Sequence, residues 1–132
     1  MLVTGARTGI GSATAERLLE EGARVVATAR DAASLPESGA ENLALDVTSS
    51  DSWTAVIAAT LERFGCLDGL VNNAGVRESG TVEATSDALW RQMIDTNLSS
   101  VFFGCRAVAP HLAEGGAIVN VGSITGIRGT EN

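Results

Sequence analysis

Residues 4–11 read TGARTGIG, and this segment is the strongest indication of the fold in the sequence. It follows a short apolar run at residues 1–3 and precedes helical spacing at residues 10–19, so its glycines join a predicted strand to a predicted helix. Gly5 can adopt the positive φ of a tight turn without steric cost. Gly9 and Gly11 lack a Cβ, which lets a ligand and a neighbouring strand approach the backbone. The helix that begins there points its free N–H groups and the positive end of its dipole at the turn, which suits a phosphate.

Composition narrows the class of protein. The 132 residues suffice for one domain with a real core, and 45% of them are hydrophobic. No lysine follows the last glycine, so the turn is not a Walker-type phosphate loop. A net charge of −7 argues against nucleic acid as a partner. No apolar run approaches the ~20 residues of a membrane span and no signal segment is evident, so we expect a cytoplasmic protein without a membrane partner.

Strands and helices are predicted to alternate along the chain. The predicted strands occupy residues 1–3, Arg24–Ala29, Asn42–Val47, Leu67–Asn72 and Ala117–Val121. Helical patterns cover residues 10–19, a short turn at Asp31–Leu35, a helix up to Gly65 with Thr48 and Asp51 at capping-box spacing, and Ser86–Leu112 with a break near Asn97. This alternation, with strands that are apolar on both faces, indicates an α/β fold with a doubly wound parallel sheet.

Several motifs occur in one order along the chain. They are the glycine turn of residues 4–11, Asp46-Val47, Asn72-Asn73-Ala74-Gly75, Asn97, and Ser123 in the run Val121-Gly122-Ser123-Ile124. With these motifs the chain resembles the N-terminal part of a short-chain dehydrogenase/reductase over essentially its whole length. The resemblance implies a Rossmann-type sheet with strand order 3-2-1-4-5, the first five of the family's seven strands. Residues 1–132 are accordingly expected to form a single NAD(P)-binding domain that is truncated at its C-terminus.

The resemblance also implies a reaction. In this family, hydride passes between the nicotinamide and a carbonyl or alcohol carbon of a small-molecule substrate. The family pattern assigns Ser123 to the substrate oxygen and Asn97 to a water in a proton relay. The family's acid–base group is a Tyr-x-x-x-Lys pair, and this chain has no tyrosine and no lysine. We therefore expect an oxidoreductase whose isolated chain is inactive, because positioned acid–base catalysis is worth ~10²–10⁴-fold. The open alternative is a non-catalytic nucleotide-binding or interaction module.

The family pattern predicts which residues bind the cofactor, namely Thr4, Gly5, Arg7, Thr8, Gly9, Ile10, Gly11, Arg30, Asp46, Val47, Asn73, Ala74 and Gly75. NAD-selective members place an acid at the end of the second strand, where this chain has Ala29 followed by Arg30. A guanidinium binds a 2′-phosphate through charge-assisted hydrogen bonds, and Arg7 could add a second contact. We therefore predict NADP (NADPH) in preference to NAD. The alternative is that Arg30 is a solvated charge paired with Asp31.

Simpler structural explanations stay open for other residues. Asp46 could cap the helix that follows it, since aspartate is a good capping residue. Asn72 and Asn73 could serve only as turn formers at a strand end. Trp53 and Trp90 are interpreted as packing residues rather than as stacking platforms for a ligand.

Two further expectations concern metals and partners. Cys66 and Cys105 match no metal-ligand spacing, so we expect two reduced thiols and no metal site. The family associates through helices that correspond to Ser86–Leu112, which leaves open a homo-oligomer formed by this surface. The substrate class follows from the resemblance alone, and nothing in the chain identifies the particular carbonyl or alcohol.

Overall fold

The computed structural model describes residues 1–126 and 128 and contains a five-stranded parallel sheet. The strands are β1 (Leu2–Thr4), β2 (Val26–Ala29), β3 (Glu41–Ala44), β4 (Leu67–Asn72) and β5 (Leu112–Asn120). Their order, β3-β2-β1-β4-β5, confirms the predicted topology and the α/β fold. Because the strands are parallel, the residues that follow β1, β2 and β4 meet at one edge of the sheet, where such folds bind ligands.

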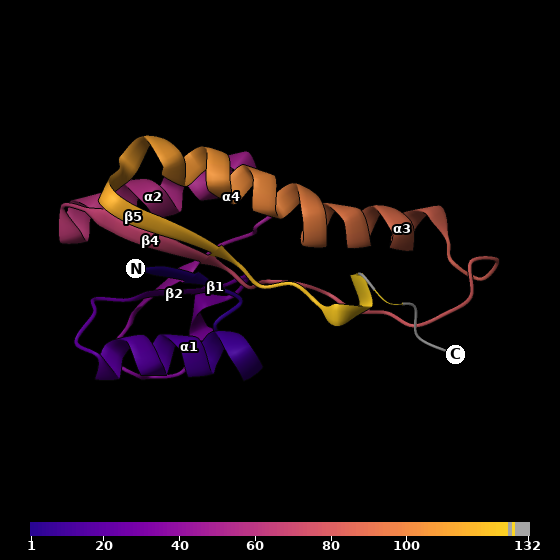
Figure 1. Ribbon diagram of the computed structural model, residues 1–132, viewed down its shortest axis with the longest axis horizontal. Helices are drawn as coiled ribbons and strands as arrows, with labels where there is room; N and C mark the ends of the chain where they lie inside the picture. The colour runs from indigo at the N-terminus through magenta and orange to yellow at the C-terminus, as the bar shows by residue number, and fades with distance from the viewer. Residues whose placement is uncertain (127, 129–132) are drawn as a thin grey trace.

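Helices cover both faces of the sheet (Figure 1). The helix α1 (Gly9–Glu20) lies on one face, whereas α2 (Ser50–Phe64) and α4 (Ser100–Val108) lie on the other. The helix α3 (Asp87–Ile94) continues the line of α4 past the ends of the strands. Short 3₁₀ turns are η1 (Ala32–Ser34), η3 (Ala109–His111) and η4 (Ile124–Gly126). Within the described residues, no helix is both long enough and apolar enough to cross a bilayer.

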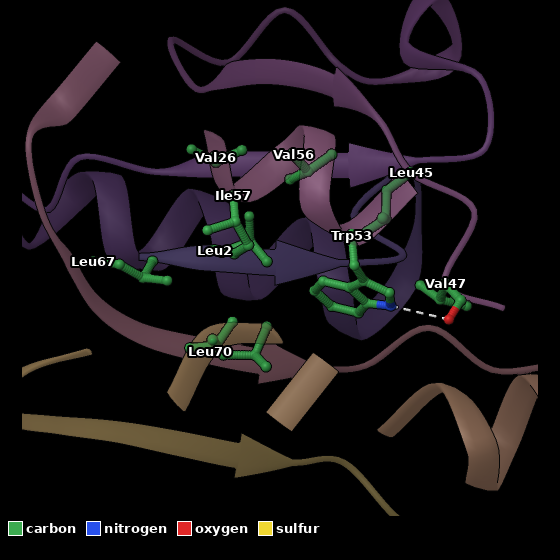
Figure 2. Close-up of a cluster of buried hydrophobic side chains, with 10 residues drawn as sticks. Leu2, Val26, Leu45, Val47, Trp53, Val56, Ile57, Leu67 and Leu70 are labelled. Carbon is green, nitrogen blue, oxygen red and sulfur yellow. Dashed lines mark hydrogen bonds between the residues drawn. The ribbon is translucent and has the colours of Figure 1, made fainter. Parts of the chain in front are cut away.

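The side chains of β1 point alternately to the two faces, and each face has its own core. Leu2 belongs to a cluster under α2 and α4, and Val3 belongs to a cluster under α1. Figure 2 shows the first cluster, in which the indole Nε1 of the buried Trp53 donates to the carbonyl of Val47 at 3.0 Å. The packing role predicted for Trp53 is therefore confirmed. The same prediction is wrong for Trp90, which is 61% exposed.

The start of α2 differs from the predicted one. Ser49 is the N-cap residue, and its hydroxyl accepts a hydrogen bond from the amide of Ser52 at 3.3 Å. The predicted capping box of Thr48 and Asp51 is wrong, because Asp46 holds Thr48 in a turn ahead of the helix. The Asp46 carboxylate accepts from the amide and the hydroxyl of Thr48 at 2.9 and 2.7 Å. Asp46 therefore caps this turn and not α2.

Four strands begin or end at other residues than predicted, because each strand extends only as far as the strand it pairs with. The strand β1 is shifted by one residue, to Leu2–Thr4 from residues 1–3. The strand β2 begins at Val26, opposite Leu2, rather than at Arg24. The strand β3 ends at Ala44, opposite Ala29, rather than at Val47. The strand β5 begins at Leu112, opposite Leu67, rather than at Ala117, and its register shifts before Ala117 pairs with Gly69.

The long helical stretch is interrupted where the sequence predicts a break. Residues Asp95–Ser99 form η2, a π turn between α3 and α4 that includes Asn97. A π turn carries one extra residue, and such turns are frequent at functional sites. The break therefore marks the segment of the helix that faces the sheet edge described below.

Candidate functional site

The turn between β1 and α1 lies in backbone contact with the end of β4. Gly5 has a φ of +64°, and a Cβ at this residue would lie 2.8 Å from the Cα of Ala74. A Cβ at Gly11 would lie 2.5 Å from the side-chain nitrogen of Asn73. Both positions exclude larger residues, Gly5 by its backbone conformation and Gly11 by space alone. The glycine pattern thus permits a close approach of two chain segments.

Hydrogen bonds fix the turn against the end of β4. The buried hydroxyl of Thr4 donates to the carbonyl of Val71 at 3.3 Å and accepts from the amides of Asn73 and Ala74 at 2.9 and 3.0 Å. The Asn73 side chain donates to the carbonyls of Thr4 and Gly5 at 2.9 and 3.2 Å. The Asn73 side chain therefore braces the glycine turn rather than a turn at the end of its own strand. Thr4 and Asn73 shape the turn through their side chains.

The first turn of α1 is open to an anion. Thr8 precedes the helix with an extended backbone, and among the described residues its side chain makes no capping hydrogen bond. No acidic side chain occurs in that first turn. The free amides at the start of the helix and its dipole are then available to a negatively charged group outside the chain.

A cleft of about 780 Å³ opens at the carboxyl edge of the sheet, a volume in the range of small-molecule sites. Most of the predicted cofactor-binding residues line it, namely Gly5, Arg7, Thr8, Ile10, Arg30, Asp46, Val47, Asn73, Ala74 and Gly75. Thr4 and Gly11 are packed beneath the turn, and Gly9 lies within it at a φ of +61°. The sheet topology thus brings residues that follow β1, β2, β3 and β4 to one cavity.

Two arginines contribute positive charge to the wall of the cleft. Arg7 lies in the glycine turn and Arg30 follows β2, and both are exposed and line the cleft. The ion pairs among the described residues are Arg17–Glu21, Arg63–Glu41 and Arg91–Asp87, and they do not include Arg30. Among the described residues Arg30 forms no ion pair with Asp31, and its exposed guanidinium still fits the alternative of a solvated charge at the strand end.

Asp46 supplies a negative charge to another part of the wall. The hydroxyl and the amide of Thr48 lower the pKa of the Asp46 carboxyl, and Arg30 contributes a smaller attraction in the same direction. The carboxyl is therefore ionised well into acidic solution. Leu45 and Val47, on either side of Asp46, are buried and line the same cleft. The wall can thus offer a flat ring both an apolar surface and hydrogen-bond acceptors.

Asn97 reaches the cleft through the backbone of Val76. Its side-chain oxygen accepts from the Val76 amide at 2.8 Å, and its side-chain nitrogen donates to the Val76 carbonyl at 2.9 Å. Val76 lines the cleft together with Gly75. Asn97 therefore holds the chain segment after β4 against the π turn. Its side chain is engaged with the protein backbone in this arrangement.

Ser123 lies apart from this constellation. It follows β5 in an exposed segment, and its hydroxyl oxygen lies 2.8 Å from that of Thr125. Ser123 is not among the residues that line the cleft, and within the described residues no hydrogen bond joins it to Asn97. The structure thus brings the predicted cofactor-binding residues together but does not assemble the two predicted catalytic residues.

The cleft also contains polar residues that the sequence did not point out. They are Asp31, Ser34, Thr48, Gln92, Asp95 and Thr96. Gln92 comes from α3, and Asp95 and Thr96 come from the π turn. The predicted break near Asn97 is therefore the feature of the sequence that could have indicated this part of the site. Asp31 and Ser34 belong to the predicted turn after Arg30, and their proximity to that arginine was the corresponding signal.

Comparison with known proteins agrees with this geometry. A family model described as short chain dehydrogenase matches residues 1–132. A 3beta-hydroxysteroid dehydrogenase of Mediterraneibacter gnavus is 46% identical, over 98% of this chain and 51% of its own length. An NADP-dependent (R)-specific alcohol dehydrogenase of Lentilactobacillus kefiri is 36% identical, over 97% of this chain and 55% of its own length. A metagenomic short-chain oxidoreductase, solved in complex with NADP, superposes with a TM-score of 0.86 at 39% identity and covers 95% of this chain and 61% of the other.

The chain spans about half the length of the curated relatives it matches. Together these findings show that the chain belongs to the short-chain dehydrogenase/reductase family of oxidoreductases, which use a nicotinamide cofactor.

Proposed function

We propose that the chain is the cofactor-binding part of an NADP-dependent oxidoreductase that transfers hydride between nicotinamide and a small carbonyl or alcohol compound. The observation that carries this proposal is the cleft, in which the open first turn of α1 and two cationic side chains lie at the carboxyl edge of the sheet. A pyrophosphate needs amide donors, and a 2′-phosphate needs cations. The residues present therefore fit a dinucleotide phosphate.

The preference for NADP rests on the end of β2. Ala29 offers no carboxylate to the ribose hydroxyls. The guanidinium of the next residue, Arg30, takes part in none of the ion pairs of the described residues. Arg7 lies on the same cleft. An NADP-dependent alcohol dehydrogenase and an oxidoreductase solved with NADP are among the relatives of this chain. These observations support NADP without excluding some affinity for NAD.

We assign the following roles to residues of this chain. The amides of Ile10 and Gly11 would bind the pyrophosphate, and Asp46 would accept hydrogen bonds from the adenine. The cofactor, when bound, supplies or accepts the hydride. Asn97 would position the wall of the cleft at Val76, and Ser123 would hold the substrate oxygen in the complete protein.

Catalysis by this chain alone is not expected. It contains no tyrosine and no lysine, and the general acid–base step of the family depends on both. Arginine cannot replace the lysine, since its guanidinium stays charged and has a different shape. We propose that residues 1–132 form one nucleotide-binding domain that requires further acid–base residues for turnover. Both cysteines are free thiols, which fits the cytoplasmic location that we propose.

Calorimetric titration of the purified chain tests this function. We expect NADPH to bind more tightly than NADH, and Arg30→Ala to weaken NADPH binding about 10- to 100-fold with little effect on NADH. Arg17→Ala is the matched control, because Arg17 is an exposed arginine of α1 that does not line the cleft. Equal or tighter binding of NADH would overturn the NADP preference. Oxidation of NADPH by the chain in the presence of a carbonyl compound would overturn the expected inactivity.

A further inference from the structure

Asp31 places a carboxylate on the cleft beside Arg30. Arg30, Asp31 and Ser34 all line the cavity and are all exposed. This end of the cleft is where the proposed function puts the adenosine 2′-phosphate. The wall there therefore carries one positive and one negative side chain in consecutive residues.

The turn η1 fixes the position of this carboxylate. One carboxylate oxygen of Asp31 accepts from the amide of Ala33 at 3.0 Å. The hydroxyl of Ser34 donates to the backbone carbonyl of Asp31 at 2.6 Å. Asp31 is therefore the N-cap of η1, and the cap keeps its charge on the cleft wall rather than in an ion pair with Arg30.

We propose that Asp31 lowers the selectivity of this site for NADP over NAD. The proposal rests on the function proposed above. A carboxylate repels the doubly charged 2′-phosphate, whereas the second carboxylate oxygen can accept a hydrogen bond from the 2′-hydroxyl of NAD. Arg30 acts in the opposite direction, since it attracts the phosphate. The ratio of the two affinities is then set by this adjacent pair of residues.

Two variants remove the charge and keep the cap. Asparagine and serine are as good as aspartate at an N-cap, so Asp31→Asn and Asp31→Ser should retain η1. The matched control is Glu20→Gln, which removes an exposed carboxylate at the far end of α1, outside the cleft. Each chain is titrated with NADP⁺ and with NAD⁺ by calorimetry, and circular dichroism confirms that the variants are folded.

We expect both Asp31 variants to raise the ratio of NADP⁺ to NAD⁺ affinity about three- to ten-fold, and Glu20→Gln to leave the ratio unchanged. This rise in the affinity ratio should be smaller at high salt, because salt screens the repulsion between the Asp31 carboxylate and the 2′-phosphate. An unchanged or lower ratio in both Asp31 variants would overturn the inference while leaving the proposed function intact. A wild-type preference for NAD⁺ that still shifts towards NADP⁺ in the variants would overturn only the NADP preference. Absence of binding by every chain would overturn both.

Discussion

The contact between the glycine turn and the end of β4 depends on the missing side chain at Gly11 as well as on the one at Gly5. A Cβ at Gly11 would lie 2.5 Å from the Asn73 side-chain nitrogen and closer still to the carbonyl oxygen of Gly5. The Gly5 carbonyl is backbone and itself accepts from Asn73, so neither neighbour can move without loss of a hydrogen bond. Space, rather than backbone conformation, therefore requires glycine at this residue.

Gly11→Ala is accordingly expected to destabilise the chain by up to about 2 kcal/mol. Alanine gains about 1 kcal/mol of helix propensity, but overpacking against backbone costs about 1–3 kcal/mol, and it also displaces the amides that would bind phosphate. Urea unfolding measures the loss, and NADPH titration should show weaker binding. Gly80→Ala is the control, since a Cβ at Gly80 meets no described atom within 4 Å. Equal unfolding free energies for wild type and Gly11→Ala would contradict this account.

Asp46 and Thr48 provide a test at acidic pH. The Thr48 hydroxyl and amide lower the pKa of the Asp46 carboxyl below the ordinary value for aspartate. A depressed folded-state pKa adds stability that is present above the unfolded pKa and is lost as the pH falls through the folded pKa. Wild type should therefore lose slightly more stability than Thr48→Val as the pH falls through the range in which aspartate carboxyls take up protons, by less than about 1 kcal/mol because Asp46 is solvent-exposed.

An NMR titration of the Asp46 side chain measures this effect directly. We expect the pKa of Asp46 to be lower in wild type than in Thr48→Val, in which the hydroxyl donor is replaced by a methyl group of similar shape. Thr54→Val is a control, because the Thr54 hydroxyl donates to the backbone of α2 and has no contact with Asp46. The same pKa in wild type and Thr48→Val would show that the hydroxyl bond does not stabilise the charged form.

At the scale of elements, the sequence predicts the existence and type of each segment better than its ends. Periodicity and glycine positions suffice for five strands, the helices and the break near Asn97. The end of β3 depends on where its partner β2 ends. The start of α2 depends on which of several neighbouring polar residues accepts a hydrogen bond from the free amides of the first turn. Thr48, Ser49 and Asp51 are all competent at a helix start, so only the turn made by Asp46 decides between them.

The π turn η2 holds the chain segment after β4 through one side chain. Asn97 makes two hydrogen bonds to Val76, one to its amide and one to its carbonyl. Asn97→Ala should remove both and expose the Val76 amide to hydrogen exchange, at a cost of about 1 kcal/mol because water can replace the partners. Ser99→Ala changes a residue of the same π turn whose side chain makes no hydrogen bond among those described, and it should leave that amide protected. Retained protection in Asn97→Ala would show that the segment is held by other contacts.

For the whole molecule, the cleft could be predicted in outline but not in full. The residues that follow β1, β2 and β4 were identifiable, because the topology of a parallel sheet places them at one edge. Gln92, Asp95 and Thr96 could not be identified from the sequence as residues of the cleft. Their place in its wall depends on how α3 continues past the sheet. The exposure of Trp90 was missed for a related reason. Helical periodicity marks an apolar face, but it does not say whether this chain or another molecule covers that face.

An apolar stripe on the outer face of the α3–α4 line is the surface through which we propose that two copies associate. Trp90, Leu98 and Phe102 are 61%, 64% and 59% exposed. Leu98 of the π turn η2 lies about one turn before Phe102 of α4, and the extra residue of the π turn brings Trp90 into line about two turns before Leu98. Exposed apolar surface of this kind is typical of protein–protein contacts.

Leu98→Glu should therefore weaken self-association at least about tenfold in sedimentation equilibrium, because a charge would be buried in the contact. Val82→Glu is the control, since Val82 is 90% exposed in the segment before α3 and lies off this stripe. Association could instead use the edge of the sheet, where Val119 of β5 is 51% exposed. Dissociation by Val119→Glu and not by Leu98→Glu would assign the contact to that edge. A wild-type chain that stays monomeric at high concentration would contradict both, because neither surface would then bind a second copy.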